Sequence, residues 1–526
     1  FVPNDGNAET IARICRRLEG VPLAIELAAA RSRLLPPAAL LERLDHRLDV
    51  LVGGARDLPE RQRTLRATLT WSYDLLDDDE RSVFESFGVF VGSFSLAAAE
   101  AVGAAVTSSD VLEVVASLTD KSLLRVEMAA GEPRFRMLEM LGEFARERLD
   151  DSGQADHVGE RHALVYWDLS AEVAAGVRSA EQARWLERLV HDGDGDNLRA
   201  AIAWFLRHRR LDELADVAWA LWVPAWIGGR LQEARCIAHA ALAVDGDLSA
   251  KSRARLLAGA GWFDLWQGDR TQAERMLREA HEISRSRGDD EVLALATLGL
   301  SLVADPADGH ELAVRLAQES VELSRRRGDH WGEALALTMM GVINVRHRQL
   351  EGNRELFEEG LSGAIAVGDG HLAVIAEMNM AAYLLDHGDV DAAATLLASS
   401  VRRQRSIRLV YSMLFLLHGA ASVARAHGNE TLASLLLGAA SQQRRSIGAS
   451  GRGNQAGRNR LIEDLRATLT RQVFAEAFDK GTTLSYADAL DAAARATETR
   501  DSRRFRPRSS VAWLRPPRTK RSEAHA

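Results

Sequence analysis

Residues 251–290 have the sequence KSRARLLAGAGWFDLWQGDRTQAERMLREAHEISRSRGDD, and the pattern of this segment recurs every 40 residues along 211–450. Turn residues stand at the middle of each repeat and at its end. They are Gly228, Gly268, Asp308, Arg348, Gly388 and Gly428 at the first phase, and Gly288, Gly328, Gly368 and Gly448 at the second. Because the segments between them have helical length and period, the pattern predicts six antiparallel helix pairs. Their first helices are expected to begin near residues 211, 251, 291, 331, 371 and 411.

Small residues recur at two further phases, where they would let neighbouring helices approach closely. They are Ala240, Ala280, Ser320, Gly360, Ser400 and Ala440, and Gly261, Ser301, Gly341, Ala381 and Ala421. Large apolar residues at another phase are expected to form a continuous core. They are Leu277, Phe357, Leu397 and Leu437. The predicted fold class is therefore mainly α, with an α-solenoid over 211–450 that binds a protein or small-molecule partner and does not itself catalyse a reaction.

Arginines gather on the predicted second helices of two pairs. They are Arg285, Arg287, Arg325, Arg326 and Arg327. We interpret these positions as solvated helix faces. The alternative is that they line the concave surface of the solenoid and meet an acidic partner.

The composition is that of a mainly helical protein with several domains. Of the 526 residues, 46% are hydrophobic and 27% are charged, as in ordinary globular proteins. The net charge of −9 argues against a broad nucleic-acid-binding surface. Cys15 and Cys236 cannot build a disulfide framework, so we expect two small buried residues in a reducing cytoplasm.

The sequence shows no signal for a membrane. The longest apolar run, 217–229, is too short to span a bilayer and contains Pro224. No secretory signal opens the chain, so a cytoplasmic location is expected. The first residue is Phe1 and not Met, which indicates that an upstream part of the gene product is missing.

Catalytic and metal-binding motifs are not found in the sequence. None of the four lysines, Lys121, Lys251, Lys480 and Lys520, follows a glycine. A phosphate-binding loop of the form G-x-x-x-x-G-K-[ST] therefore cannot be placed. No apolar strand ends in paired acidic residues, and no histidines or cysteines have the spacing of H-E-x-x-H or C-x-x-C. We predict no catalytic residue, no metal site and no enzyme activity for this chain.

The first 62 residues are predicted to form short helices. An apolar face recurs at Ile11, Ile14, Cys15 and Leu18. Gly20 and Pro22 are residues that end one helix and begin the next. From these residues alone, Gly20-Val21-Pro22-Leu23-Ala24 is either a corner between two helices or a ligand contact.

Residues 63–150 are predicted to form three helices and a hairpin. The second helix starts at a capping box of Asp77 and Glu80. It is expected to turn five apolar residues inward, namely Val83, Phe84, Phe87, Phe90 and Val91. A third helix follows Ser109, and Leu123–Met128 and Arg134–Leu138 are expected to pair as strands around a turn at 129–133. A further helix buries Leu141, Phe144, Ala145 and Leu149. This order predicts a winged helix.

The charge around the third helix of this region does not favour a DNA reader. Asp110, Glu113 and Asp120 lie on it or beside it, and Lys121 is the nearby cation. Cations supply much of the affinity for phosphates. We therefore interpret 63–150 as a protein-contact or nucleotide-sensing module.

Three motifs carry a resemblance to a known family. They are GVPLAIELAAAR at 20–31, LPERQRTL at 58–65 and WSYDLL at 71–76. These motifs resemble the distal nucleotide-binding region of bacterial STAND-class signal-transducing ATPases, relatives of the NB-ARC proteins. In that family a P-loop domain precedes a small helical domain, a winged helix and helical repeats. Many members are transcriptional regulators, often with a LuxR-type helix-turn-helix at the C-terminus. The repeats themselves resemble lengthened tetratricopeptide units.

The resemblance implies several roles for this chain. Residues 1–62 would be the helical lid of the nucleotide-binding region, with Gly20, Pro22 and Leu23 as cofactor-binding residues and Pro22 near the adenine. ATP or ADP would bind the longer parent protein with an upstream ATPase domain, and neither is expected to bind tightly to this chain alone. DNA would be contacted only through a domain missing here, and a ligand-dependent oligomer is a further expectation. Leu138 stands where related proteins carry an ADP-sensing histidine, so that form of sensing is not expected.

The remaining regions are a helical connector at 151–210, a C-terminal helical cap at 451–498 and a basic, disordered tail at 499–526. Three tryptophans of the connector, Trp167, Trp185 and Trp204, are interpreted as core anchors. The connector also contains DNLRAA at 196–201, a phrase shared with the resembled family. In the cap, 461–480 is amphipathic and 484–494 is a second short helix.

Two functions remain open from the sequence. In the first, the chain is the sensor and regulatory arm of a STAND-type transcriptional regulator, and an inducer on the repeats controls the nucleotide state through the lid and winged helix. In the second, the chain is a protein-binding repeat scaffold without a nucleotide or DNA role.

Overall fold

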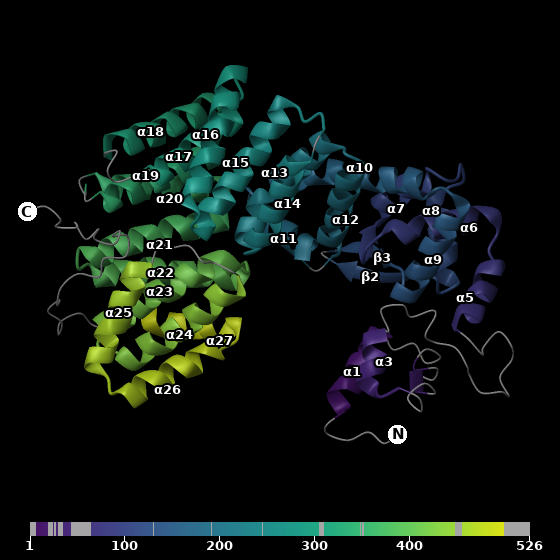
Figure 1. Cartoon of the computed structure of the whole chain (residues 1–526). Helices are drawn as coiled ribbons and strands as arrows, with labels where there is room; N and C mark the ends of the chain where they lie inside the picture. Colours follow the sequence, from purple (N-terminus) through teal and green to yellow (C-terminus); the bar gives the residue numbers. More distant parts are fainter. Residues whose placement is uncertain are drawn as a thin grey trace, which may run out of the picture. The chain divides into compact units, whose positions relative to one another are not determined.

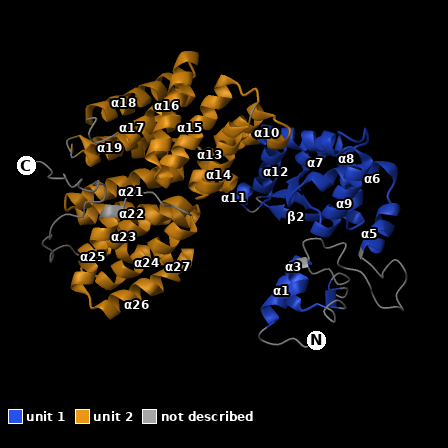
Figure 2. Ribbon diagram, viewed as in Figure 1, with its two compact units in different colours: residues 1–169, 187–204 blue, residues 170–186, 205–526 orange. Residues whose placement is uncertain are grey.

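The computed structural model describes the chain in two compact units. The described residues are 7–18, 25, 28–29, 35–43, 65–129, 131–190, 192–244, 246–304, 310–347, 349, 352–447 and 455–498. Unit 1 comprises Phe1–Leu169 and Glu187–Trp204, and unit 2 comprises Ser170–Leu186 and Phe205–Ala526 (Figure 2). The described elements are almost all helices, together with three short strands (Figure 1). The predicted fold class, mainly α with a solenoid of helix pairs, is confirmed.

Two short helices stand at the start of unit 1. They are α1 (Ala8–Arg17) and α3 (Pro37–Arg43). Ile14 and Leu18 are buried, as the apolar face predicts. The predicted site residues Gly20, Pro22 and Leu23 lie outside the described residues.

The next part of unit 1 alternates helices and short strands. Its elements are α5 (Leu65–Asp74), α6 (Asp78–Ser86), the 3₁₀ helix η3 (Phe87–Val89), β1 (Ser93–Ser95), α7 (Leu96–Gly103), α8 (Val111–Asp120), β2 (Arg125–Ala129), β3 (Glu132–Arg136) and α9 (Glu139–Ser152). The capping box is confirmed, because the Asp77 carboxylate accepts from the Glu80 amide and the Glu80 carboxylate accepts from the Asp77 amide. The prediction that Val91 points inward is wrong: the α-helix ends at Ser86, and Val91 is 42% exposed.

The three strands form one antiparallel sheet in the order β1-β3-β2. The predicted hairpin is confirmed as β2 and β3, although its turn is shorter than expected because Ala129 already pairs with Glu132. Strand β1 was not predicted. It aligns Phe94 with Phe135, and Phe94 stacks on Phe90 with ring centroids 4.0 Å apart. The burial of Phe94 thus holds β1 against the hairpin as a third strand.

Three helices, α10 (Ala155–Gly176), α11 (Gln182–Val190) and α12 (Asp194–Arg207), have residues in both units. Trp185 and Trp204 are buried, as predicted for core anchors, and Trp167 is partly buried. Glycines of α10 make room for both buried rings. A Cβ at Gly159 would lie 2.8 Å from Trp204 Nε1, and one at Gly176 would collide with Trp185.

The six predicted helix pairs are confirmed, and each first helix begins within one residue of its predicted start. The pairs are α13 (Leu211–Ile227) with α14 (Leu231–Ala243), α15 (Ala250–Gln267) with α16 (Arg270–Arg287), α17 (Asp290–Val303) with α18 (His310–Arg327), α19 (His330–Arg346) with α20 (Asn353–Val367), α21 (Gly370–Asp386) with α22 (Val390–Ser406), and α23 (Val410–Ala426) with α24 (Glu430–Ser446).

Many of the turns between consecutive helices consist of a glycine followed by a capping residue. Gly268 ends α15 in the left-handed conformation, and the carboxylate of the next residue, Asp269, caps α16. The same glycine and cap recur at 288–289, 328–329, 368–369, 388–389 and 428–429. In the first pair the predicted turn residue Gly228 does lie in the turn, and the next residue, Gly229, has the left-handed conformation. Asp308, Arg348 and Gly448 lie outside the described residues.

The small residues of the repeat allow close helix contacts, with one exception. A Cβ at Gly261 would lie 2.6 Å from the side chain of Leu277, and one at Gly341 would lie 2.7 Å from the ring of Phe357. The predicted core residues Leu277, Phe357, Leu397 and Leu437 are all buried. Ala240 is exposed, contrary to prediction. The reason is that α14 ends soon after it, at Ala243, whereas α16 continues from the equivalent Ala280 to Arg287.

The first and last helix pairs contact each other. The ring centroids of Trp226 on α13 and Tyr411 on α23 are 6.2 Å apart. A Cβ at Gly229 would meet Ile447 at 2.9 Å and Val410 at 3.2 Å. The solenoid therefore completes a turn, and the inward faces of its first helices meet one another.

Three further helices pack against the last pairs. They are α25 (Gln455–Thr468), α26 (Arg471–Thr482) and α27 (Tyr486–Thr497). The amphipathic segment 461–480 is two helices and not one, because Thr470 caps α26 by accepting from the Val473 amide. The tail at 499–526 lies outside the described residues. No helix in the described part of the chain is long and apolar enough to cross a membrane.

Candidate functional site

A basic cavity lies between α1 and α3, in the region predicted to be the lid. Its volume is about 590 Å³, and it is lined by Thr10, Arg13, Arg16, Arg17, Ala38, Leu41 and Glu42. Three arginines against one glutamate make this cavity suited to an anion. The nucleotide contact predicted for Gly20, Pro22 and Leu23 falls outside the described residues. Leu138 stands at the start of α9, two residues after the end of β3, and offers no side-chain hydrogen bond.

A buried polar junction in unit 1 joins the strands to α12. Asn197, from the DNLRAA phrase, is fully buried. Its Oδ1 accepts from the Val91 amide at 2.8 Å, and its Nδ2 donates to the carbonyl oxygens of Val91 and Ser93 at 3.0 and 3.1 Å. Gly193 must approach the same strand, because a Cβ there would lie 2.6 Å from the Ser93 oxygen. The side chain of Asn197 thus replaces a strand partner for β1.

An ion pair completes this junction. Arg134 on β3 donates to Asp194 Oδ1 at 2.7 Å and to the Ser93 oxygen at 3.2 Å, and it also binds the Asp192 carbonyl oxygen. Asp194 Oδ2 accepts from Arg188 Nε at 2.9 Å. Burial raises the pKa of the nearby Asp192 carboxyl. The charges are buried but mutually compensated, as stability requires.

The junction also contains a buried histidine. His162 Nε2 lies 3.1 Å from Asn197 Oδ1, so the ring is the donor and carries its proton on Nε2. Its ring contacts Tyr166 at 4.8 Å and Phe90 at 5.4 Å. Burial lowers the pKa of His162 to about 4, which keeps it neutral near pH 7.

We expect this histidine to make unit 1 sensitive to acid. As the pH falls through about 6.5, the unfolded chain takes up a proton that the folded chain refuses until about pH 4. The free energy of unfolding of unit 1 is therefore unaffected by the titration of His162 above pH 6.5. Between pH 6.5 and 4 it falls by a total of about 3 kcal/mol, because the unfolded chain is protonated first. Urea unfolding at several pH values should show a flatter pH dependence for His162→Gln than for the natural chain. Parallel curves would contradict the assignment.

An aromatic cluster occupies the inner face of the solenoid in unit 2. Its rings come from α13, α15, α19, α21 and α23, and they are Trp219, Trp222, Trp226, Trp262, Trp266, Trp331, His371 and Tyr411. Trp226 stacks on Trp266 with centroids 4.7 Å apart, and His371 meets Trp226 edge-on at 4.6 Å. These positions follow the repeat. Trp222 and Trp262 are equivalent, as are Trp226 and Trp266, and Trp331, His371 and Tyr411 share a third phase.

Some polar atoms of the cluster have partners and others do not. Trp262 Nε1 donates to the Leu295 oxygen at 3.0 Å, and Trp331 Nε1 donates to Asp369 Oδ2 at 2.6 Å. By contrast, the Nε1 atoms of Trp222 and Trp226 and both ring nitrogens of His371 are buried without a partner in the described part of the chain. Burial lowers the pKa of His371 to about 3, so this ring is neutral.

The segment between α10 and α11 is fastened to this cluster. The Arg178 guanidinium lies over Trp331 at 4.5 Å and over Trp222 at 5.7 Å. Gln182, which is fully buried, donates to Asp369 Oδ1 at 2.8 Å and accepts from the His371 amide at 3.0 Å. We call Arg178 and Gln182, with their partner Asp369, the connector latch. Burial raises the pKa of Asp369, although hydrogen bonds from Leu372, Trp331, Gln182 and His371 oppose this.

Sequence reasoning missed both the cluster and the latch. The equal spacing of the aromatic residues was a usable signal, because a ring repeated at one phase of a solenoid must return to the same face. No local pattern marks Arg178 or Gln182. The arginines at 285 and 325–327 lie on partly or largely exposed positions and pair with acids of this chain, as Arg285 does with Glu319.

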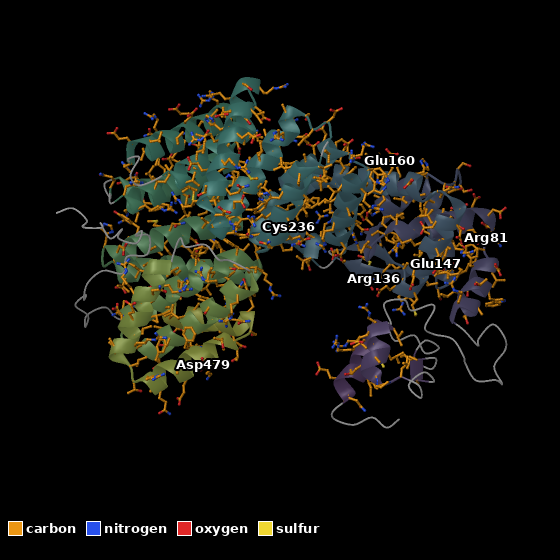
Figure 3. The ribbon with its side chains drawn as sticks, viewed as in Figure 1. Arg81, Arg136, Glu147, Glu160, Cys236 and Asp479 are labelled. Atoms are coloured by element: carbon orange, nitrogen blue, oxygen red, sulfur yellow. The ribbon has the colours of Figure 1, made fainter. Side chains whose placement is uncertain are left out.

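The two cysteines do not have the predicted environment. Cys15 is partly buried, and Cys236 is exposed on α14 (Figure 3). Cys236 stands on the outer side of a helix whose inner face already provides Leu231, Ala238 and Ala241 to the core. Within the described part of the chain, no group of three or more histidine, cysteine, aspartate or glutamate residues could hold a metal ion.

Comparisons with known proteins place the chain beside bacterial regulators. No family model matches it. A protein of Mycobacterium tuberculosis provisionally named an HTH-type transcriptional regulator is 40% identical over 232 residues, which are 43% of this chain and 26% of that protein. An uncharacterized protein of the same species is 40% identical over 165 residues, or 31% of this chain and 42% of that protein. The chain thus matches about a quarter of the regulator's length.

A solved structure gives a further comparison. It is that of a STAND protein with a tetratricopeptide repeat sensor from Pyrococcus horikoshii, which is 16% identical, with a TM-score of 0.41 over 90% of this chain and 74% of that chain. The resemblance to bacterial regulators predicted from the sequence is confirmed, because over 43% of its length the chain is similar to a mycobacterial protein named as an HTH-type transcriptional regulator.

Proposed function

We propose that this chain is the sensor and regulatory arm of a STAND-type, ATP-binding transcriptional regulator. The solenoid binds an inducer, and residues 1–62 and 63–150 act as the lid and winged helix that control the nucleotide. ATP or ADP is bound by the longer protein, whose P-loop domain performs any hydrolysis, and this chain is not itself an enzyme. DNA is contacted through another part of that protein, in keeping with the name of the mycobacterial relative.

The observation that carries the proposal is the connector latch. Gln182 and Arg178 belong to the segment that leads along the chain to α12, and they bind Asp369, His371, Trp222 and Trp331 of the aromatic cluster. A molecule that changes these contacts therefore acts directly on the connector. A ligand shifts a conformational equilibrium only through such differential contacts.

The helices and strands of 63–150 support a winged helix that does not read DNA. The Asp110 carboxylate on the predicted third helix is used as the cap of α8. Lys121, the cation beside that helix, is paired with Glu80, which also accepts from Ser117. Asp110 and Lys121 thus stabilise the fold around α8, and Lys121 is already paired with an acid and is not available to bind phosphate.

Nucleotide exchange tests the proposal. In the longer protein with its P-loop domain, Gln182→Ala removes the donor to Asp369 and the acceptor of the His371 amide. We expect the release of a fluorescent ADP analogue to change by roughly 5-fold or more, the lower range of allosteric couplings. Gln232→Ala on α14 is the matched control, because the exposed Gln232 amide contacts Cys236 on the same helix.

The outcome separates the two functions considered for the chain. A release rate that Gln182→Ala leaves unchanged, with folding verified by circular dichroism, would overturn the regulatory proposal. That result would favour a protein-binding repeat scaffold without a nucleotide role.

A further inference from the structure

The aromatic cluster concentrates its unpartnered polar atoms in three touching residues. Trp222 and Trp226 are stacked with centroids 6.2 Å apart and an interplanar angle of 5°, and His371 meets Trp226 edge-on. Four buried nitrogens of these residues have no partner in the described part of the chain. An unpaired buried polar group costs about 1–3 kcal/mol. Such a concentration therefore needs an explanation.

The fold does satisfy the neighbouring indoles. Trp219, Trp262 and Trp331 each donate their Nε1 proton, to Glu291, to the Leu295 oxygen and to Asp369 respectively. The unpaired atoms of Trp222, Trp226 and His371 are thus not a general property of a crowded aromatic core. They belong to adjacent rings, Trp222 on Trp226 and Trp226 on His371, where a partner from outside the chain would satisfy them.

The three residues come from opposite ends of the solenoid. Trp222 and Trp226 lie on α13, in the first pair, and His371 lies at the start of α21, in the fifth. They meet because the solenoid completes a turn. Trp266, which is partly exposed, stacks on Trp226 at the edge of the group. The site is therefore formed only by the closed array.

The atoms define the chemistry of the missing partner. An indole nitrogen only donates a hydrogen bond, and a neutral imidazole donates once and accepts once. The buried Nε of Arg178, beside Trp222, is a further donor without a partner in the described part. Donors therefore outnumber acceptors, and the partner must carry acceptor oxygens. The surrounding ring faces require a flat, apolar body.

The charge of the site favours a neutral molecule. His371 is uncharged, and Arg178, whose guanidinium lies over Trp222, has the acids Asp369, Glu291 and Asp329 in electrostatic reach. An additional ionised group would have to be desolvated without a free counter-charge. The partner is thus expected to carry carbonyl oxygens and no carboxylate.

We propose that Trp222, Trp226 and His371 form a ligand site for a small, uncharged, planar aromatic molecule with carbonyl-type acceptor oxygens. This inference rests on the proposed function, since it names the inducer class of the sensor. The bound molecule takes hydrogen bonds from the two indoles and the imidazole and places its ring among theirs. It then touches Trp222 and His371, the residues that also hold Arg178 and Gln182.

Fragment binding to this complete chain tests the site. Coumarin has a flat bicyclic body and a lactone carbonyl, and naphthalene has the same body without an acceptor. Saturation-transfer NMR and calorimetry should show binding of coumarin and none of naphthalene. His371→Phe keeps a ring against Trp226 but removes two nitrogens, and it should weaken coumarin binding roughly tenfold, as loss of one such hydrogen bond implies. No coumarin binding, equal binding of naphthalene, or undiminished binding by His371→Phe would each overturn the proposal.

Stability provides a second, independent measurement. Because His371→Phe deletes unsatisfied buried atoms, the melting temperature without ligand should be unchanged or higher. His162→Phe is the matched control, because His162 is equally buried but has Asn197 as its partner, and it should lower the melting temperature. A similar loss for both variants would show that the His371 imidazole is structural, and would overturn the proposal.

The two proposals fail separately. Coumarin binding to this chain with nucleotide release insensitive to Gln182→Ala would refute only the regulatory function. Nucleotide release that responds to Gln182→Ala, in a chain that does not bind coumarin, would refute only this ligand site.

Discussion

Replacement of Asp194 by alanine is expected to lower the free energy of unfolding of unit 1 by about 3–5 kcal/mol. The side chains of Asp194 and Arg134 are each 3% exposed and are joined by a 2.7 Å bond. Removing the carboxylate leaves the Arg134 guanidinium charged, buried and held only by carbonyl oxygens. Urea denaturation, with unfolding of unit 1 followed by amide hydrogen exchange, measures the loss.

The matched control lies two residues later on the same helix. Asp196 pairs with Arg199, but these side chains are 48% and 39% exposed. Solvent screens such a pair, so Asp196→Ala should cost less than about 1 kcal/mol. Equal losses for the two substitutions would contradict the view that burial makes the Arg134 pair indispensable.

Replacement of Phe357 by alanine should lower the stability of unit 2 by about 3–5 kcal/mol. The Phe357 ring is fully buried on α20. The ring fills the space beside Gly341 on α19, where an added Cβ would come within 2.7 Å of it. The ring centroids of Phe357 and Tyr383, on α21, are 6.0 Å apart. Alanine would leave a cavity between two consecutive first helices. Thermal unfolding monitored by circular dichroism gives the effect.

The control for this substitution is on the same helix. Ile365 of α20 is 53% exposed, so Ile365→Ala should change stability by about 0.5 kcal/mol or less. A loss below about 1 kcal/mol for Phe357→Ala would show that the neighbouring pairs are not packed as a continuous core.

The repeats were predictable because their interactions are local. Six of the described turns use a glycine in the left-handed conformation and an aspartate or asparagine cap, as at Gly268 and Asp269, and both choices are written in adjacent residues. Each pair packs mainly on its neighbours, so the small residue at 341 and the large residue at 357 already imply their contact. The helix starts were accordingly predicted within one residue.

The candidate sites could not be predicted in the same way. Strand β1 is three residues long. It exists because Phe94 packs among other rings and because Asn197 donates to the carbonyl oxygen of Ser93, 104 residues away. The latch joins Gln182 to Asp369, which are 187 residues apart. The lid residues Gly20, Pro22 and Leu23 stay a prediction from the family resemblance.

The sequence alone determined the helical repeat, the capping box, the hairpin and the motifs shared with STAND-class regulators. Periodicity and turn chemistry act over a few residues, so one repeat is enough to specify its own helix pair. The tertiary structure alone decided that the array completes a turn, which brings Trp226 to Tyr411 and His371. It leaves buried nitrogens that have no partner among the described residues. That closure depends on the small rotation from each helix pair to the next, summed over the five steps between the first pair and the sixth. No single repeat encodes this sum.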